Sequence, residues 1–226
     1  MTTFCIKSDD TYESVGTTPN DTKTKLLQKI LSLFPRRMRE RLVEIEFSTK
    51  DFAEGAASVS PLDEDGVLWQ MWVNTHSEAL KDEKEIMVTI AHELTHYLTL
   101  NSTQRDSDKR VCSDMIETLN NCPTKSSVYF DFIEQFWKSI YNKSLWPEGD
   151  YNGYYDAHSD DFVTPYAVTN PSEDIAETFS FFIFEKEPTD VSKIKDKKMQ
   201  YFYKFPEFVT LRSERLEVIL NVRLNR

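Results

Sequence analysis

The hydrophobic pattern of the N-terminal half predicts two strands and two helices. Apolar positions recur at helical spacing in residues 23–34, so this segment should form an amphipathic helix. Residues 42–47 alternate apolar and charged side chains, as a half-buried strand does, and residues 66–74 form a second predicted strand that is rich in Trp and Val. A long helix is predicted to begin near Asp82. Its apolar stripe consists of Ile86, Ile90, Leu94 and Leu98.

The C-terminal half is predicted to be mainly helical. Pro171 suits the start of a helix, because its fixed φ angle is already helical. A few strands followed by helices indicate an α+β fold rather than the alternating strands and helices of a parallel sheet. Helices are predicted over residues 126–140, 171–185, 190–204 and 206–222, and polar loops over residues 101–125 and 141–165.

Residues 1–22 differ from the rest of the chain in composition. They are rich in Thr, Ser, Asp and Asn and offer little to bury, so we expect a flexible leader followed by a single domain over residues 23–226. Leaders of this kind often follow a secretion signal or a lipid anchor. We therefore expect the protein to be secreted or held at the cell envelope, and we favour a monomer.

The composition excludes several classes of function. The 226 residues include 27 Lys and Arg against 38 Asp and Glu, which gives a net charge of −11. A chain this acidic repels phosphate backbones, so nucleic-acid binding is excluded as its main role. The 5 glycines argue against glycine-rich nucleotide-binding folds. No apolar run reaches the roughly 18 residues that a transmembrane segment needs.

Two of the three cysteines are candidates for a disulfide. Cys112 and Cys122 flank a short polar segment, and a bond between them would close a small loop. We predict this disulfide, and two free thiols are the alternative. Cys5 lies apart from them in the predicted leader.

Residues 92–96 form the strongest chemical signal of the chain, an H-E-x-x-H motif on the predicted long helix. His92 and His96 are four residues apart, so they share one face of a helix with Cβ atoms about 5–6 Å apart. Both imidazoles can then reach one Zn²⁺ at about 2.0–2.1 Å. Glu93 projects beside the metal and can accept a proton from a water whose pKa zinc lowers to about 7. Ordinary polar histidines on a helix surface are the alternative interpretation.

A catalytic zinc usually has three protein ligands, so the motif alone is incomplete. Thr99 and Ser102 stand where the metzincin motif needs Gly and His, which excludes that class. Glu173 and Glu177 are also four residues apart on a predicted helix, so one can bind zinc while the other orients a histidine. Alternatively, both simply decorate the start of this helix. Asp174 points about 100° away from Glu173 and is expected to be structural.

The segment Tyr166-Ala-Val-Thr-Asn-Pro-Ser-Glu173-Asp-Ile-Ala-Glu177-Thr-Phe179 resembles the second-helix signature of gluzincin metallopeptidases. It is similar to lethal-factor-type and Pro-Pro endopeptidase-type catalytic domains and to bacterial zinc-binding metallopeptidases. The similarity covers residues 87–100 and 162–183. The resemblance implies a zincin-like fold, with Glu93 as the general base, Tyr166 as the oxyanion stabiliser and Glu177 beside a histidine ligand. It implies that the zinc ligands are His92, His96 and Glu173.

Three further predictions concern the surroundings of this site. Tyr166 lies between Pro165 and Pro171, so we expect it in extended chain that presents its hydroxyl over the metal, with a packed tyrosine as the alternative. His158 is a rival hydrogen-bond donor or ligand. Residues 66–74 are a candidate edge strand that pairs with substrate backbone and packs one face on the active-site helix, or else an ordinary core strand.

The sequence therefore predicts a zinc-dependent endopeptidase that acts on a protein or peptide substrate. A non-catalytic zinc-containing binding protein and a zinc hydrolase of a non-peptide amide are the alternatives. Residues 150–153 hint at a calcium loop, but the ligand spacing of an EF-hand is absent, so we predict no calcium site there.

Overall fold

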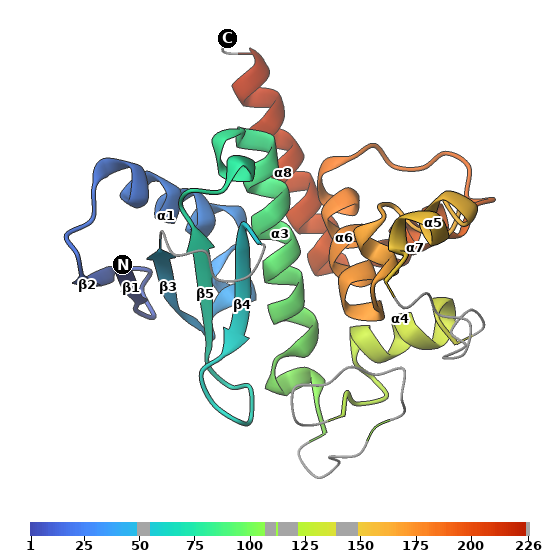
Figure 1. Ribbon diagram of the computed structural model, residues 1–226, viewed down its shortest axis with the longest axis horizontal. Coiled ribbons are helices and arrows are strands. Elements are labelled where there is room, and N and C mark those ends of the chain that lie inside the picture. The colour runs from blue at the N-terminus through green and yellow to red at the C-terminus, as the bar shows by residue number, and fades with distance from the viewer. Residues whose placement is uncertain (49–54, 107–111, 113–121, 139–148, 225–226) are drawn as a thin grey trace. The chain divides into compact units, whose positions relative to one another are not determined.

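The computed structural model describes residues 1–48, 55–106, 112, 122–138 and 149–224 (Figure 1). It has the predicted α+β composition, with one five-stranded sheet and helices that dominate the second half of the chain. The chain divides into two compact units, Met1–Thr103 and Gln104–Arg226, which we call the N-terminal and C-terminal units. The single domain over residues 23–226 stays a prediction. No helix in the described part of the chain is both long and apolar enough to cross a membrane.

The N-terminal unit contains the whole sheet. Strands β3 and β5 are parallel, and the other neighbouring pairs are antiparallel, in the order β2-β1-β3-β5-β4. The strands are β1 (Thr2–Ile6), β2 (Tyr12–Gly16), β3 (Leu42–Ser48), β4 (Ala57–Pro61) and β5 (Trp69–Asn74). The helices are α1 (Asp21–Leu33), α2 (Arg36–Arg39) and α3 (Glu83–Leu100), with the 3-10 turns η1 (Glu78–Lys81) and η2 (Ser102–Gln104).

The expectation of a flexible leader over residues 1–22 is wrong, because this segment supplies β1, β2 and the start of α1. Thr2, Phe4 and Ile6 alternate on the buried face of β1. The Phe4 ring meets Phe47 of β3 edge-on, with the ring centroids 5.6 Å apart. The partner of β1 is β3, which lies about 40 residues further along the chain. This pairing stabilises the strand although its own sequence contains few apolar residues.

Strand β5 is an inner strand of the sheet, which corrects the prediction that residues 66–74 form an edge strand. It lies between β3 and β4, and among the described residues β4 is the last strand on that side. The prediction that one face packs on the long helix is confirmed. Trp69, Met71 and Val73 are buried, and the Trp69 ring meets Tyr97 of α3 at a centroid distance of 5.8 Å.

Helix α3 begins and ends where local capping residues stand. The Asp82 carboxylate accepts hydrogen bonds from the backbone N–H groups of Lys84 and Glu85, as an N-cap does. At the other end, the Asn101 amide donates to the carbonyl oxygen of Tyr97 at 2.9 Å. These contacts satisfy backbone groups that a helix end otherwise leaves open. The predicted start near Asp82 is confirmed.

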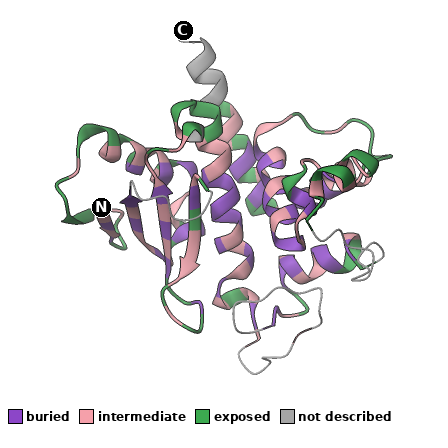
Figure 2. Ribbon diagram, viewed as in Figure 1, coloured by how far each residue is buried: buried purple, intermediate pink, exposed green. Residues whose placement is uncertain are grey.

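The C-terminal unit is helical, and the predicted helices are present within the described residues. Helix α5 falls inside the loop predicted over residues 141–165, of which residues 141–148 lie outside the described part. Figure 2 shows that α6 is largely buried. The elements are α4 (Val128–Phe136), α5 (Tyr151–Ala157), η3 (Tyr166–Val168), α6 (Pro171–Phe184), α7 (Ile194–Tyr201), η4 (Phe202–Lys204) and α8 (Pro206–Leu224).

A close contact between two residues explains the start of α5. The Asp150 carboxylate accepts a hydrogen bond from the backbone N–H of Gly153 at 3.0 Å. A Cβ atom at Gly153 would lie 2.4 Å from an oxygen of that carboxylate, so glycine leaves room for the cap. Asp150 is therefore the N-cap of α5.

The predicted disulfide is present. Cys112 and Cys122 are joined with a Cα–Cα distance of 5.5 Å, and Cys5 is not part of a disulfide. Residues 113–121 of the loop that the bond closes lie outside the described part of the chain.

Candidate metal centre

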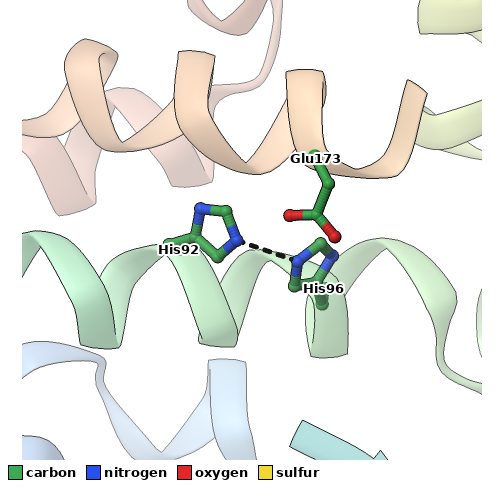
Figure 3. A group of neighbouring side chains, drawn as sticks. All are labelled: His92, His96 and Glu173. Atoms are coloured by element: carbon green, nitrogen blue, oxygen red, sulfur yellow. Dashed lines mark hydrogen bonds between the residues drawn. The ribbon is translucent and has the colours of Figure 1, made fainter. Parts of the chain in front are cut away.

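The two histidines of the H-E-x-x-H motif lie on one face of α3 with their rings close together (Figure 3). The Nε2 atoms of His92 and His96 are 3.0 Å apart, and the ring centroids are 4.7 Å apart at an interplanar angle of 79°. Two ligand nitrogens of a tetrahedral zinc site, each bonded at about 2.0–2.1 Å, lie about 3.3–3.4 Å apart. The side chains are therefore already near the spacing that one metal ion requires.

Contacts within the N-terminal unit hold α3 in place beneath these histidines. The backbone N–H of Arg41 donates to the Tyr97 hydroxyl at 3.2 Å, one residue beyond His96. Burial raises the pKa of Tyr97, so the hydroxyl stays protonated. Trp69 packs against the same ring. The helix is thus attached to the sheet at the turn that carries the second histidine.

Glu93 is buried together with His92. Glu93 is 9% exposed and His92 is 7% exposed. A buried carboxylate is costly unless charged or hydrogen-bonding groups compensate it. The alternative that the motif consists of ordinary surface groups does not fit this burial.

Glu173 lies in the first turn of α6. The Asn170 side chain caps this helix and accepts a hydrogen bond from the Glu173 backbone N–H at 2.9 Å, and Pro171 occupies the first helical position. Both are typical signals of a helix start. The cap holds the backbone of Glu173, and its side chain is half-buried.

His92, His96 and Glu173 form a group that could hold a metal ion. Each offers one ligand atom, and these atoms all lie within 4.8 Å of one another (Figure 3). Two imidazole nitrogens and one carboxylate oxygen are a donor set found in catalytic zinc sites. The structure thus brings together the three residues predicted as ligands. Among the described residues no other such group includes His158.

The prediction that Tyr166 lies in extended chain is wrong. It begins the 3-10 turn η3, where its carbonyl oxygen accepts hydrogen bonds from the N–H and the hydroxyl of Thr169. Pro165 has helical angles, φ −59° and ψ −30°. The steric effect of a proline falls on the residue before it, and the proline itself can begin a turn. The Tyr166 side chain is 53% exposed, which does not fit a packed core tyrosine.

Glu177 makes a contact that sequence reasoning did not predict. Its Oε2 atom accepts a hydrogen bond from the Thr164 hydroxyl at 2.7 Å, and the Thr164 oxygen accepts one from the Ala167 N–H at 3.1 Å. The bond therefore connects α6 to the turn that begins at Tyr166. A threonine directly before Pro165 was a signal for such a capped turn.

His158 belongs to a different group of side chains. Its ring stacks on Tyr154 with centroids 4.2 Å apart, and its Nδ1 atom lies 3.3 Å from a carboxylate oxygen of Asp161. Burial raises the pKa of Tyr154, and the Asp161 charge adds to this shift. These contacts account for His158 by packing within the C-terminal unit.

Asp174, the neighbour of Glu173, is fully buried and forms an ion pair with Lys198 at 2.6 Å. Its carboxylate also accepts hydrogen bonds from Trp137 Nε1 at 2.7 Å and from the Thr178 hydroxyl at 3.2 Å. Burial raises the pKa of Asp174 and lowers the pKa of Lys198, and the contact between the two opposes both shifts. The expectation that Asp174 is structural fits these contacts, whereas sequence analysis missed Lys198.

Comparisons of the chain with protein-family models, with curated proteins and with solved structures find no match.

Proposed function

We propose that the chain is a zinc-dependent endopeptidase of the gluzincin type with a zincin-like fold. The observation that carries this proposal is the group formed by His92, His96 and Glu173, with its ligand atoms within 4.8 Å of one another. Glu93 directly follows the first of these ligands and is buried beside it. A metal site with a purely structural role has no need of a carboxylate at that position.

In the proposed reaction, Glu93 transfers a proton and Tyr166 stabilises a developing negative charge. Zinc held by such a site supplies Lewis acidity and lowers the pKa of a water molecule to about 7. With such a metal bound, Glu93 would accept a proton from the water molecule that attacks the peptide carbonyl carbon, and would later pass this proton to the departing amine. Tyr166 donates its O–H to the developing oxyanion, an interaction worth about 2.7–4 kcal/mol in comparable sites.

Strand β4 takes over the role first assigned to residues 66–74. It is the last strand of the sheet next to β5, so its outer edge can pair with an extended peptide. Backbone pairing of this kind gives affinity with little choice of side chain. It supports a polypeptide substrate over a small amide.

The Cys112–Cys122 bond supports the proposed location outside the reducing cytosol. Structural disulfides persist in secreted and cell-envelope proteins and are rare in the cytosol. Alkylation of the native protein before and after reduction tests this location. Labelling of Cys112 and Cys122 without reduction would contradict it.

The decisive experiment compares the native chain with Glu93→Gln. The native chain should contain one zinc by elemental analysis and should cleave a peptide library, with products identified by mass spectrometry. Glu93→Gln should retain the zinc and lose cleavage, because only the proton acceptor has changed. Zinc without any cleavage would favour a binding protein. Hydrolysis confined to non-peptide amides would favour a zinc hydrolase of such amides. Iron instead of zinc would contradict the proposal, since two histidines and a carboxylate also bind Fe(II).

A further inference from the structure

Lys198 of α7 is a fully buried lysine with contacts to three residues in two other segments of the C-terminal unit. Its ammonium lies 2.6 Å from Oδ2 of Asp174 and donates a hydrogen bond to the carbonyl oxygen of Asp161 at 2.8 Å. It also lies 4.0 Å from the ring centroid of Phe162. An ammonium removed from water needs such partners, and here they come from α6 and from the chain that precedes η3.

The contact with Asp174 reaches the residue next to Glu173. Trp137 and Thr178 bind the same carboxylate, so the Asp174 side chain is held from three directions. The first turn of α6 is thereby fixed on its buried side. The Asn170 cap fixes the same turn at its end.

The contacts with Asp161 and Phe162 reach the segment that leads to Tyr166. Two residues beyond Phe162, Thr164 donates its hydrogen bond to Glu177 and accepts one from Ala167 at the start of η3. Lys198 therefore holds the chain just before this turn, while Asp174 holds the helix that carries Glu177.

We infer that Lys198 is a positioning residue that fixes the Glu173 turn and the Tyr166 turn relative to each other. This inference rests on the proposed metal site, because it assigns Lys198 the placement of one ligand and of the oxyanion donor. Net stability is a weaker explanation, since a buried ion pair often contributes no more than well-packed apolar residues of similar volume. A small displacement of a ligand or donor, by contrast, is sufficient to weaken a metal site and slow catalysis.

The test uses the full chain with Lys198→Met and Asp174→Asn combined. The double variant leaves no unpaired buried charge and fills the volume of the lysine stem. The carbonyl oxygen of the introduced asparagine can accept from Trp137, and its NH2 group can donate to the Thr178 hydroxyl oxygen. Lys195→Met is the matched control on α7, because Lys195 donates to the carbonyl oxygen of Ser159 but not to Asp174.

Arg212→Met is the second control. Arg212 donates to the carbonyl oxygens of Phe182 and Glu185 at the other end of α6, so its loss weakens the same helix far from Glu173 in sequence. All variants are compared under conditions in which circular dichroism shows them fully folded. If the double variant does not fold, Lys198→Gln replaces it with the same measurements.

The measurements are zinc affinity by chelator competition, the visible spectrum of the Co²⁺-substituted protein, and kcat and KM on one peptide. We expect the positioning variant to lose zinc affinity by about 10–100-fold, to change the Co²⁺ spectrum and to lower kcat more than it raises KM. Both controls should keep the native spectrum and affinity. A native spectrum and affinity in the positioning variant would overturn the inference, as would equal changes in the controls.

Glu173→Gln separates this inference from the proposed function. The proposed metal site is wrong if the native chain binds neither Zn²⁺ nor Co²⁺, or if Glu173→Gln binds them as tightly as the native chain does. The inference about Lys198 then fails as well. If binding depends on Glu173 while the positioning variant behaves like the native chain, only the role of Lys198 is wrong.

Discussion

The Nε2 atoms of His92 and His96 lie 3.0 Å apart on one face of α3. This arrangement predicts one zinc per chain and the loss of tight binding in His92→Ala or His96→Ala, because only two protein ligands then remain. Elemental analysis after dialysis measures the metal content. His158→Ala is the matched control and should retain the metal. Full zinc content in either alanine variant on α3 would contradict the assignment.

The two glutamates of α6 should differ in their effect on metal binding. Glu173→Ala should remove the metal, because it removes a direct ligand. Glu177→Ala should weaken binding by roughly 10–100-fold, as the loss of a group that supports a ligand does. Thr164→Val removes the observed hydrogen bond to Glu177 while leaving both carboxylates in place. Zinc titration against a chelator measures each affinity, and a larger loss in Glu177→Ala than in Glu173→Ala would exchange the two roles.

Tyr166→Phe tests the proposed oxyanion donor. Removing only the hydroxyl should leave the fold and the zinc content intact, since the side chain is 53% exposed. It should lower kcat by roughly 10²–10³ with little change in KM, because the hydroxyl acts on the oxyanion and not on the bound substrate. Steady-state kinetics on a cleaved peptide measures both constants. Native turnover would remove Tyr166 from the mechanism, and Tyr154, Tyr155 and His158 would then be examined.

Arg39 should be important for the stability of the N-terminal unit. It is 2% exposed, pairs with both carboxylate oxygens of Asp10 and donates to the carbonyl oxygens of Leu31 and Phe34 at the end of α1. Arg39→Met leaves these acceptors without their donor and should cost roughly 2–4 kcal/mol in the free energy of unfolding.

Urea unfolding followed by circular dichroism measures the loss in Arg39→Met. Arg37→Met, on the exposed side of α2, is the matched control and should change stability by no more than about 0.5 kcal/mol. Similar losses in the two variants would show that the contacts of Arg39 are not responsible.

Buried tyrosines should make the protein less stable in alkali. Burial raises the pKa of Tyr97 and of Tyr201, so the folded chain retains these protons after the unfolded chain has lost them at about pH 10. The unfolded state then binds fewer protons, and the free energy of unfolding falls by about 1.4 kcal/mol per pH unit for each such tyrosine.

The slope is measured by urea unfolding of the metal-free chain between about pH 9 and about pH 11. Tyr201→Phe should make the slope shallower by the contribution of one proton, about 1.4 kcal/mol per pH unit, whatever its effect on stability at neutral pH. Absorbance at 295 nm that shows all tyrosines ionised before unfolding begins would contradict the prediction.

Much of the local structure around the site could be predicted from the sequence. Asp82 marks the start of α3, and Pro171 marks the start of α6 after the Asn170 cap. The spacing of His92 and His96 also determines that they share a helix face, because helix geometry relates residues four positions apart. These features depend on a few neighbouring residues, so periodicity and capping rules are sufficient to predict them.

Other features depend on residues far apart in the chain, and only the tertiary structure decided them. Strand β1 was mistaken for part of a leader, because its burial depends on pairing with β3. Strand order likewise placed β4 and not β5 at the edge of the sheet. No local pattern marks Lys198 as buried, since lysine is almost always exposed and becomes buried only where partners such as Asp174 and Asp161 converge on it. The sequence by itself thus determined the long helices and the spacing of the H-E-x-x-H motif, whereas non-local packing determined what holds them in place.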